Sequence, residues 1–266
     1  MPPLRACALA LSLAMASIIP ACPSHAADAT PPAPAPAVPA PPPIPGVEGK
    51  PLTIMPIGDS ITQGSGGFYV YRYPLMEKLR AAGYNVQYVG SQTTGTPKNA
   101  PLGVLPHEGR GGNSVHDIRK KFEDGYRAFP ADIVLIHVGH NQDAANNPVP
   151  RMVESTHAII AKVREINPKV TVLVAQVITS GKLPKYEYIP EYNREVAKLG
   201  AELNTKEQPV IVVDMADGWD WQTDTVGDKV HPSKAGGEKM AQKWYDALVK
   251  ILPPPQGKPA APPSAP

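Results

Sequence analysis

A serine, a carboxylate and an imidazole occur in two short segments that could together cleave an ester or amide bond. Ser60 ends a Gly-Asp-Ser turn after an apolar run, while Asp228 and His231 lie three residues apart near the end of the chain. A serine hydroxyl is a weak nucleophile at neutral pH and needs an adjacent base, whose ring must itself be oriented. The pattern predicts Ser60 as nucleophile, His231 as general base and Asp228 as the carboxylate that orients the base.

Acyl transfer also develops negative charge on a carbonyl oxygen, which preorganised hydrogen-bond donors must meet. Gly112 lies in a glycine-rich run, and Asn141 follows a run of apolar residues. We expect an oxyanion hole formed by the backbone N–H groups of Ser60 and Gly112 and the side-chain amide of Asn141. The sequence leaves two alternatives open, Gly111 for the glycine donor and Asp224 for the carboxylate.

These four segments, in this order, resemble the conserved blocks of the SGNH, or GDSL-type, serine hydrolases, which are named for Ser, Gly, Asn and His. The resemblance extends from about Leu52 to Leu252. The stretches Met-Pro-Ile-Gly-Asp-Ser-Ile-Thr, His-Glu-Gly and Val-His-Pro are most similar to the secreted acetylxylan-esterase branch of the carbohydrate esterases. The resemblance implies a flavodoxin-like fold and ester hydrolysis through an acyl-enzyme on Ser60, without a cofactor.

The third block departs from the family pattern Gly-Thr-Asn-Asp, because this chain reads Gly139-His140-Asn141-Gln142. Gln142 removes a charge that commonly braces the site, and His140 adds a second base or a substrate contact. We expect no metal between His137 and His140. Residues three apart on a strand face opposite sides, and no carboxylate cluster accompanies the pair.

Substrate contacts are predicted from two groups of side chains. Flat aromatic faces stack on the apolar faces of sugars, which favours the segment Phe68–Tyr73 and the pair Trp219 and Trp221. Packing within the protein is the competing interpretation for both aromatic groups. The polar candidates near the expected site are Asp59, His107, Glu108 and His140. For His107 and Glu108 the sequence leaves two roles open, shaping the cleft or stabilising a loop.

Short apolar runs rich in Val and Ile alternate with longer helix-like segments, which is typical of parallel strands covered on both faces. The fold class predicted is α/β, a three-layer α/β/α arrangement with a five-stranded parallel sheet. Pro56 lacks a backbone donor, so we expect it at the frayed end of its strand. Strands are expected at 52–57, 86–90, 132–138, 170–177 and 209–213, and helices at 71–82, 114–127, 150–166, 190–204 and 233–250.

The chain has 266 residues, which suits one domain with extensions. Its start has one arginine, an apolar stretch and a small residue before Ala27, typical of a secretory signal peptide. We therefore expect export to the periplasm or medium, with a lipid anchor at Cys22 as the less favoured alternative. The predicted divisions are a signal peptide at 1–26, a Pro/Ala-rich linker at 27–47, the hydrolase domain at 48–252 and a Pro/Ala-rich tail at 253–266.

A formal net charge of +2 and the lack of a basic cluster argue against a nucleic-acid partner. No later segment has the length of apolar sequence that a membrane-spanning helix requires. The sequence therefore predicts an exported serine esterase that removes short acyl groups, acetyl foremost, from a carbohydrate or a small ester. The alternatives are a lysophospholipase- or thioesterase-type lipid esterase and, because of His140 and Gln142, a non-catalytic carbohydrate-binding module of the cell envelope.

Overall fold

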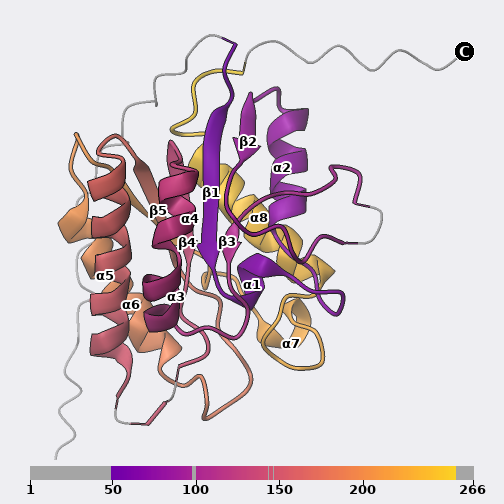
Figure 1. Ribbon diagram of the computed structural model, residues 1–266. Helices are drawn as coiled ribbons and strands as arrows, with labels where there is room; N and C mark the ends of the chain where they lie inside the picture. The colour runs from indigo at the N-terminus through magenta and orange to yellow at the C-terminus, as the bar shows by residue number, and fades with distance from the viewer. Residues whose placement is uncertain (1–48, 98–99, 143, 146, 256–266) are drawn as a thin grey trace, which may run out of the picture. The chain divides into compact units, whose positions relative to one another are not determined.

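The predicted parallel sheet is present in the computed structural model, which describes residues 49–97, 100–142, 144–145 and 147–255 (Figure 1). The predicted signal peptide and linker, and the part of the predicted tail after residue 255, lie outside the described residues. The strands are β1 (Leu52–Gly58), β2 (Val86–Tyr88), β3 (Glu108–Gly109), β4 (Ile133–His137), β5 (Thr171–Gln176) and β6 (Val210–Asp214).

All strand pairs of the sheet are parallel, in the order β2-β1-β4-β5-β6, and β3 pairs with β1 beyond the end of β2. The five predicted strands are confirmed, each to within two residues at either end. The sixth strand, β3, was not predicted, because two residues are too few to show a periodic pattern. Strands β1 and β4 are buried almost throughout, which explains their unbroken apolar sequences.

Helices cover the sheet in two groups (Figure 1). Helix α2 packs against α8, while α3, α5 and α6 pack in succession. No helix in the described part of the chain is long and apolar enough to cross a bilayer. The helices are α1 (Ser60–Gln63), α2 (Arg72–Ala81), α3 (Val115–Lys121), α4 (Glu123–Ala128), α5 (Val149–Ile166), α6 (Ile189–Leu203), α7 (Trp221–Asp224) and α8 (Lys234–Leu248).

The helix predicted at 114–127 is in fact two helices, α3 and α4, separated at the buried Phe122. Basic residues end α3, and Glu123 and Asp124 begin α4. Positive charge is favoured at a helix C-terminus and negative charge at an N-terminus. The charge order therefore favours a stop and a new start at this point, which the apolar periodicity alone did not reveal.

Pro56 lies inside β1, paired with Leu135 of β4, so its expected place at a frayed strand end was wrong. The backbone groups of Ile54 and Gly58 make hydrogen bonds on the side of β2 and β3. Because this direction alternates along a strand, the nitrogen of Pro56 also faces that side. Strand β2 pairs with β1 only as far as Ile54, and β3 begins opposite Ile57. The N–H that Pro56 lacks would therefore face the gap between strands β2 and β3.

Candidate active site

Three side chains that the sequence places far apart meet at the carboxyl end of the sheet. Ser60 Oγ lies 2.8 Å from His231 Nε2, and His231 Nδ1 lies 2.5 Å from Asp228 Oδ2. Ser60 is the first residue of α1, immediately after β1, and the other two lie in the loop before α8. Open parallel sheets place their ligands at this edge. The fold thus brings together the three residues predicted to form a catalytic triad.

The carboxylate of Asp228 holds its own loop as well as the imidazole. Its Oδ1 accepts the backbone N–H groups of Val230 and His231, each at 2.9 Å, while Oδ2 faces the ring of His231. Burial raises the pKa of Asp228, but the hydrogen bonds from His231 and Val230 more than offset this, so that the pKa lies below its ordinary value. Asp228 is therefore ionised at neutral pH.

Asp224, the alternative carboxylate, is engaged elsewhere. Its side chain is buried, pairs with Lys239 Nζ at 2.5 Å and accepts the backbone N–H of Asp220 at 2.9 Å. These contacts fix the start of α8 against α7. The structure therefore places Asp228, not Asp224, beside the imidazole.

The imidazole of His231 has a second partner, Phe68, that the sequence did not single out for this role. The two rings stack, with centroids 4.1 Å apart and an angle of 18° between their planes. A hydrogen bond of 3.0 Å from Tyr69 N–H to the Pro232 carbonyl joins the two loops beside this stack. An aromatic residue shortly after the Gly-Asp-Ser turn was the available signal, but its partner depends on how the loop folds.

The glycine-rich segment after β3 lies against Ser60, since a Cβ built on Gly111 would come within 3.7 Å of the Ser60 Cβ. The N–H of Gly111 donates to Gln63 Oε1 at 2.5 Å. Gly112, at φ 73°, makes no backbone hydrogen bond from its N–H to another described residue. Gly112, rather than Gly111, thus retains a donor for an oxyanion.

Asn141 adopts φ 62°, a left-handed conformation that asparagine tolerates better than most residues. Its Nδ2 donates to the Asn113 carbonyl at 3.3 Å, a weak bond that uses one of its two hydrogens. The Asn113 carbonyl belongs to the loop that contains Gly112. The two predicted donors are therefore held on adjoining loops, and no other described residue accepts the second hydrogen of the Asn141 amide.

The predicted polar substrate contacts are buried. Asp59, His107, Glu108 and His140 have at most 1 % of their surface exposed. His107 accepts the Gly109 N–H at 2.9 Å and its other ring nitrogen meets the Thr94 carbonyl at 2.9 Å. The carboxylate of Glu108 pairs with Arg110 at 2.8 Å. His107 and Glu108 thus stabilise the loops beneath the site. All four side chains are shielded from solvent, so their prediction as substrate contacts disagrees with the structure.

The two tryptophans differ in their exposure. Trp219 is 9 % exposed, and its indole N–H donates to the Thr179 carbonyl at 3.0 Å, so it packs within the protein. Its prediction as a substrate contact is also at odds with its burial. Trp221 is partly exposed, and Lys229 Nζ lies 5.6 Å from the centre of its ring. Of this pair, Trp221 is the one that could reach a ligand.

The structure contradicts the strand geometry from which we expected no metal at His137 and His140. The two rings are stacked, with centroids 6.0 Å apart, because β4 ends at His137 and the chain turns before His140. A carboxylate does accompany them, since Asp59 Oδ2 lies 3.7 Å from His140 Nδ1. The strand rule failed because only the first of the two histidines lies on the strand.

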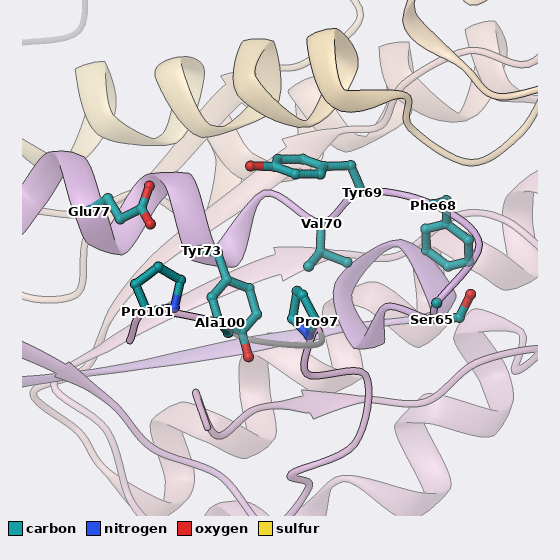
Figure 2. A pocket seen from close by; sticks show the side chains of 10 residues that line it. Ser65, Phe68, Tyr69, Val70, Tyr73, Glu77, Pro97, Ala100 and Pro101 are labelled. Atoms are coloured by element: carbon teal, nitrogen blue, oxygen red, sulfur yellow. The ribbon is translucent and has the colours of Figure 1, made fainter. Parts of the chain in front are cut away.

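A pocket of about 420 Å³ opens beside Phe68. Figure 2 shows the rings of Tyr69 and Tyr73 along it, with Glu77 at one end and Phe68 at the other. The aromatic residues of the predicted segment Phe68–Tyr73 differ in position. Tyr71 is fully buried, while Phe68, Tyr69 and Tyr73 line the pocket. The pocket adjoins the imidazole of His231 through the stacked ring of Phe68.

Carbohydrate esterases are among the known proteins to which this chain is similar. A family 3 carbohydrate esterase from Clostridium thermocellum is 28 % identical, with a TM-score of 0.61, covering 75 % of this chain and 96 % of that one. A carbohydrate esterase family 3 structure from Talaromyces cellulolyticus has a TM-score of 0.65 at 23 % identity, over 75 % and 97 % of the two chains, which shows the shared fold.

A multidomain esterase from Ruminococcus flavefaciens is 26 % identical over 231 residues, which cover 76 % of this chain but only 29 % of that protein. The family model described as GDSL-like Lipase/Acylhydrolase matches residues 57–239, more than half of the chain. The match includes Ser60, Asn141 and His231. This domain is thus of an ester-hydrolysing type, and the chain belongs to the GDSL-like lipase/acylhydrolase family.

Proposed function

We propose that this protein is an exported serine esterase that removes short acyl groups, acetyl foremost, from a carbohydrate. The observation that carries the proposal is the continuous hydrogen-bonded chain from Ser60 Oγ through the imidazole of His231 to Asp228. A serine, a base and a carboxylate in this order are the arrangement that activates a hydroxyl for attack on an acyl carbon.

In the first half of the reaction, Ser60 Oγ attacks the ester carbonyl carbon and its proton passes to His231 Nε2. The negative charge that develops on the carbonyl oxygen is met by the N–H groups of Ser60 and Gly112 and the amide of Asn141. The tetrahedral intermediate collapses to an acyl-serine, and the departing sugar oxygen takes the proton from His231.

In the second half, His231 removes a proton from water as the water oxygen attacks the acyl-serine. Collapse of this second intermediate returns the proton to Ser60 and releases the carboxylic acid. Asp228 stays ionised throughout and stabilises the imidazolium formed in each half. The chemistry needs no cofactor, because each proton moves between Ser60, His231, water and the leaving alcohol.

The choice of a carbohydrate ester is supported by the pocket beside Phe68. Tyr69 offers an aromatic face for a sugar ring, and Glu77 offers a hydrogen-bond acceptor for its hydroxyls. The names of the similar carbohydrate esterases point in the same direction. We place the sugar of the substrate in this pocket, with the acyl carbon at Ser60.

A second candidate, an esterase for longer acyl chains, is favoured by the apolar part of the same pocket. Val70 and Pro97 contribute to its wall, and an alkyl chain could occupy this surface. A non-catalytic binding module is less well supported, because it has no use for the hydrogen bond between Ser60 and His231.

The export part of the proposal rests on the predicted signal peptide at 1–26, and the domain part on the predicted boundaries at 48 and 252. Expression in a bacterium followed by mass spectrometry of the periplasmic and extracellular protein tests the export part. We expect a chain beginning at Ala27. A lipid-modified chain beginning at Cys22 would replace the soluble-export prediction by an anchored one.

The activity is tested by hydrolysis of p-nitrophenyl esters from acetate to octanoate, followed by acetate release from acetylated xylan. Ser60→Ala removes the nucleophile, and Ser91→Ala, at an exposed serine outside the site, is the matched control. We expect turnover that falls with chain length, is lost in Ser60→Ala and persists in Ser91→Ala. A rise with chain length selects the second candidate, and equal rates in both variants contradict a serine esterase.

A further inference from the structure

Three side chains of metal-binding type are buried together beneath the site. Asp59 and His137 are 0 % exposed and His140 is 1 % exposed. One ligand atom from each lies within 4.8 Å of the others, an arrangement of two imidazoles and a carboxylate. The proposed hydrolysis uses none of these three side chains, so their grouping needs its own explanation.

The pairing of β1 with β4 assembles this cluster. Gly58 lies opposite His137 in the parallel register, which places Asp59, the next residue, beside the end of β4. The chain then turns at Gly139, where a Cβ would lie 2.8 Å from the side chains of Tyr192 and Val177. This tight turn brings the imidazole of His140 back over that of His137, with 12° between the ring planes.

Five polar atoms of the cluster have no hydrogen-bond partner among the described residues. They are Oδ2 of Asp59 and both ring nitrogens of His137 and His140. Asp59 Oδ1, in contrast, accepts the Ile61 N–H at 2.9 Å. Buried polar groups are nearly always bonded, and one left unpaired costs about 1–3 kcal/mol. One missing common partner would account for one of these atoms on each of the three side chains.

We propose that Asp59, His137 and His140 bind a divalent transition-metal ion, with zinc as the expected occupant. Two imidazoles and one carboxylate form a donor set that zinc uses, and a water molecule can complete its four ligands. Zinc bonds of about 2.0–2.2 Å in a tetrahedron separate ligand atoms by about 3.3–3.6 Å. The 3.7 Å between Asp59 Oδ2 and His140 Nδ1 is already close to this range.

The surroundings of the cluster suit such an ion. His137 is fully buried, and neither of its ring nitrogens has a hydrogen-bond partner among the described residues, so a ring lone pair remains for an ion. The backbone carbonyl of Ile178 lies beside the ring of His140, outside the geometry of a formed hydrogen bond. A metal-bound histidine commonly donates its second N–H to such a carbonyl. The ring of Tyr186 meets His140 edge-on at 5.3 Å and adds an apolar wall.

A bound ion would join two parts of the proposed esterase site. Asp59 precedes Ser60, and His140 precedes Asn141, so the ion would tie the nucleophile loop to the loop that carries an oxyanion donor. Binding itself does not depend on the proposed activity, and only its effect on rate rests on the proposed function. The role of the ion is structural, because its ligands are shielded from solvent.

The test is zinc binding by the full chain, freed of metal with a chelator and then titrated with zinc sulfate. Bound zinc is measured by elemental analysis after gel filtration, and thermal unfolding is followed in parallel. We expect about one ion per chain. The melting temperature should rise by about 5–10 °C when free zinc exceeds Kd about 100-fold.

Two variants remove a ligand in different ways. Asp59→Asn keeps an oxygen that can accept the Ile61 N–H, and His140→Thr introduces the residue of the Gly-Thr-Asn-Asp pattern. Each should weaken zinc binding at least about 100-fold and lose the thermal shift. Circular dichroism shows whether each variant is folded, and two variants protect the test against the failure of one.

Two other histidine variants serve as controls. His231→Gln removes the partly exposed imidazole beside Asp228, where zinc could also bind, and His157→Gln removes an exposed histidine of α5. Both should keep one zinc per chain and the full thermal shift. The proposal is overturned if wild type binds no zinc, or if His231→Gln loses the ion while His140→Thr and Asp59→Asn keep it. Loss of esterase activity alone would bear on the proposed function and not on the metal.

Discussion

The imidazole of His231 lies flat against the ring of Phe68, with the centroids 4.1 Å apart. Its two nitrogens point to Ser60 and Asp228, so that its edge is held by hydrogen bonds and one face by an aromatic ring. Hydrogen bonds in the ring plane do not by themselves prevent the ring from tilting out of that plane. The stack therefore supplies a restraint that the three predicted triad residues lack.

Phe68→Leu should lower kcat by up to about tenfold with little change in KM for p-nitrophenyl acetate. Leucine keeps much of the volume but loses the aromatic contact, and such contacts contribute about 0.5–1.5 kcal/mol beyond burial. Phe129→Leu, at a half-exposed ring away from the site, is the control and should match wild type. A large rise in KM with kcat unchanged would instead indicate that Phe68 contacts the substrate.

Asp228→Asn should reduce kcat by about 10²–10⁴-fold while leaving the fold intact. The amide can still accept the Val230 N–H, but it cannot stabilise an imidazolium or fix the ring tautomer as a carboxylate does. The measurement is single-turnover acylation by p-nitrophenyl acetate.

The matched variant is Asp224→Asn, which breaks the buried ion pair with Lys239. It should retain most of the activity but lose about 1–3 kcal/mol of unfolding free energy, measured in urea. If Asp224→Asn abolished acylation and Asp228→Asn did not, the assignment of the carboxylate would have to be reversed.

Asn141→Gly should show what the side-chain amide contributes to the rate, separately from the backbone conformation at this position. Glycine adopts a φ of 62° at least as readily as asparagine, so the variant should fold with unchanged or slightly higher stability. Loss of one oxyanion donor should nevertheless lower kcat by about 10²–10³-fold.

Asn141→Ala should show the same kinetic loss and, in addition, a lower melting temperature, because alanine is strained at positive φ. Nearly full activity in Asn141→Gly would exclude the side chain from the oxyanion hole and leave the backbone N–H groups as the donors.

The predictable part of the site depends on local chain geometry. Asp228 and His231 are close in sequence, and Ser60 follows a strand whose apolar run is plain, so both positions could be inferred without the fold. The order of apolar runs and helix-like segments likewise predicted the parallel sheet. These features need only the short-range rules of strands, helices and turns.

The parts that could not be predicted depend on register between distant segments. Asp59 joins His137 because Gly58 pairs with His137 across β1 and β4, and apolar periodicity does not encode that register. The burial of Glu108 follows from the pairing of the two-residue strand β3 with β1. A strand of this length leaves no periodic signal, so the sequence did not decide whether Glu108 contacts substrate or stabilises a loop.

His107 should make the protein sensitive to acid over a defined range. Burial, with the nearby charge of Arg72, lowers the pKa of His107 from 6.5 to about 3. Between these values the unfolded chain binds a proton that the folded chain does not. The contribution of His107 is thus fully present above about pH 6.5 and is lost as the pH falls toward 3, by at most about 1.4 kcal/mol per pH unit.

His107→Gln removes this titration and keeps an amide that can partly replace the bonds to Gly109 and Thr94. It should be less stable than wild type near neutral pH, because the fit of the buried ring is lost. On acidification its urea midpoint should fall less steeply, so the two curves converge between about pH 6.5 and pH 4. His157→Gln, at an exposed histidine, should instead follow wild type throughout. Parallel curves for wild type and His107→Gln would mean that other groups cause the acid sensitivity, since a titration confined to His107 must disappear with its ring.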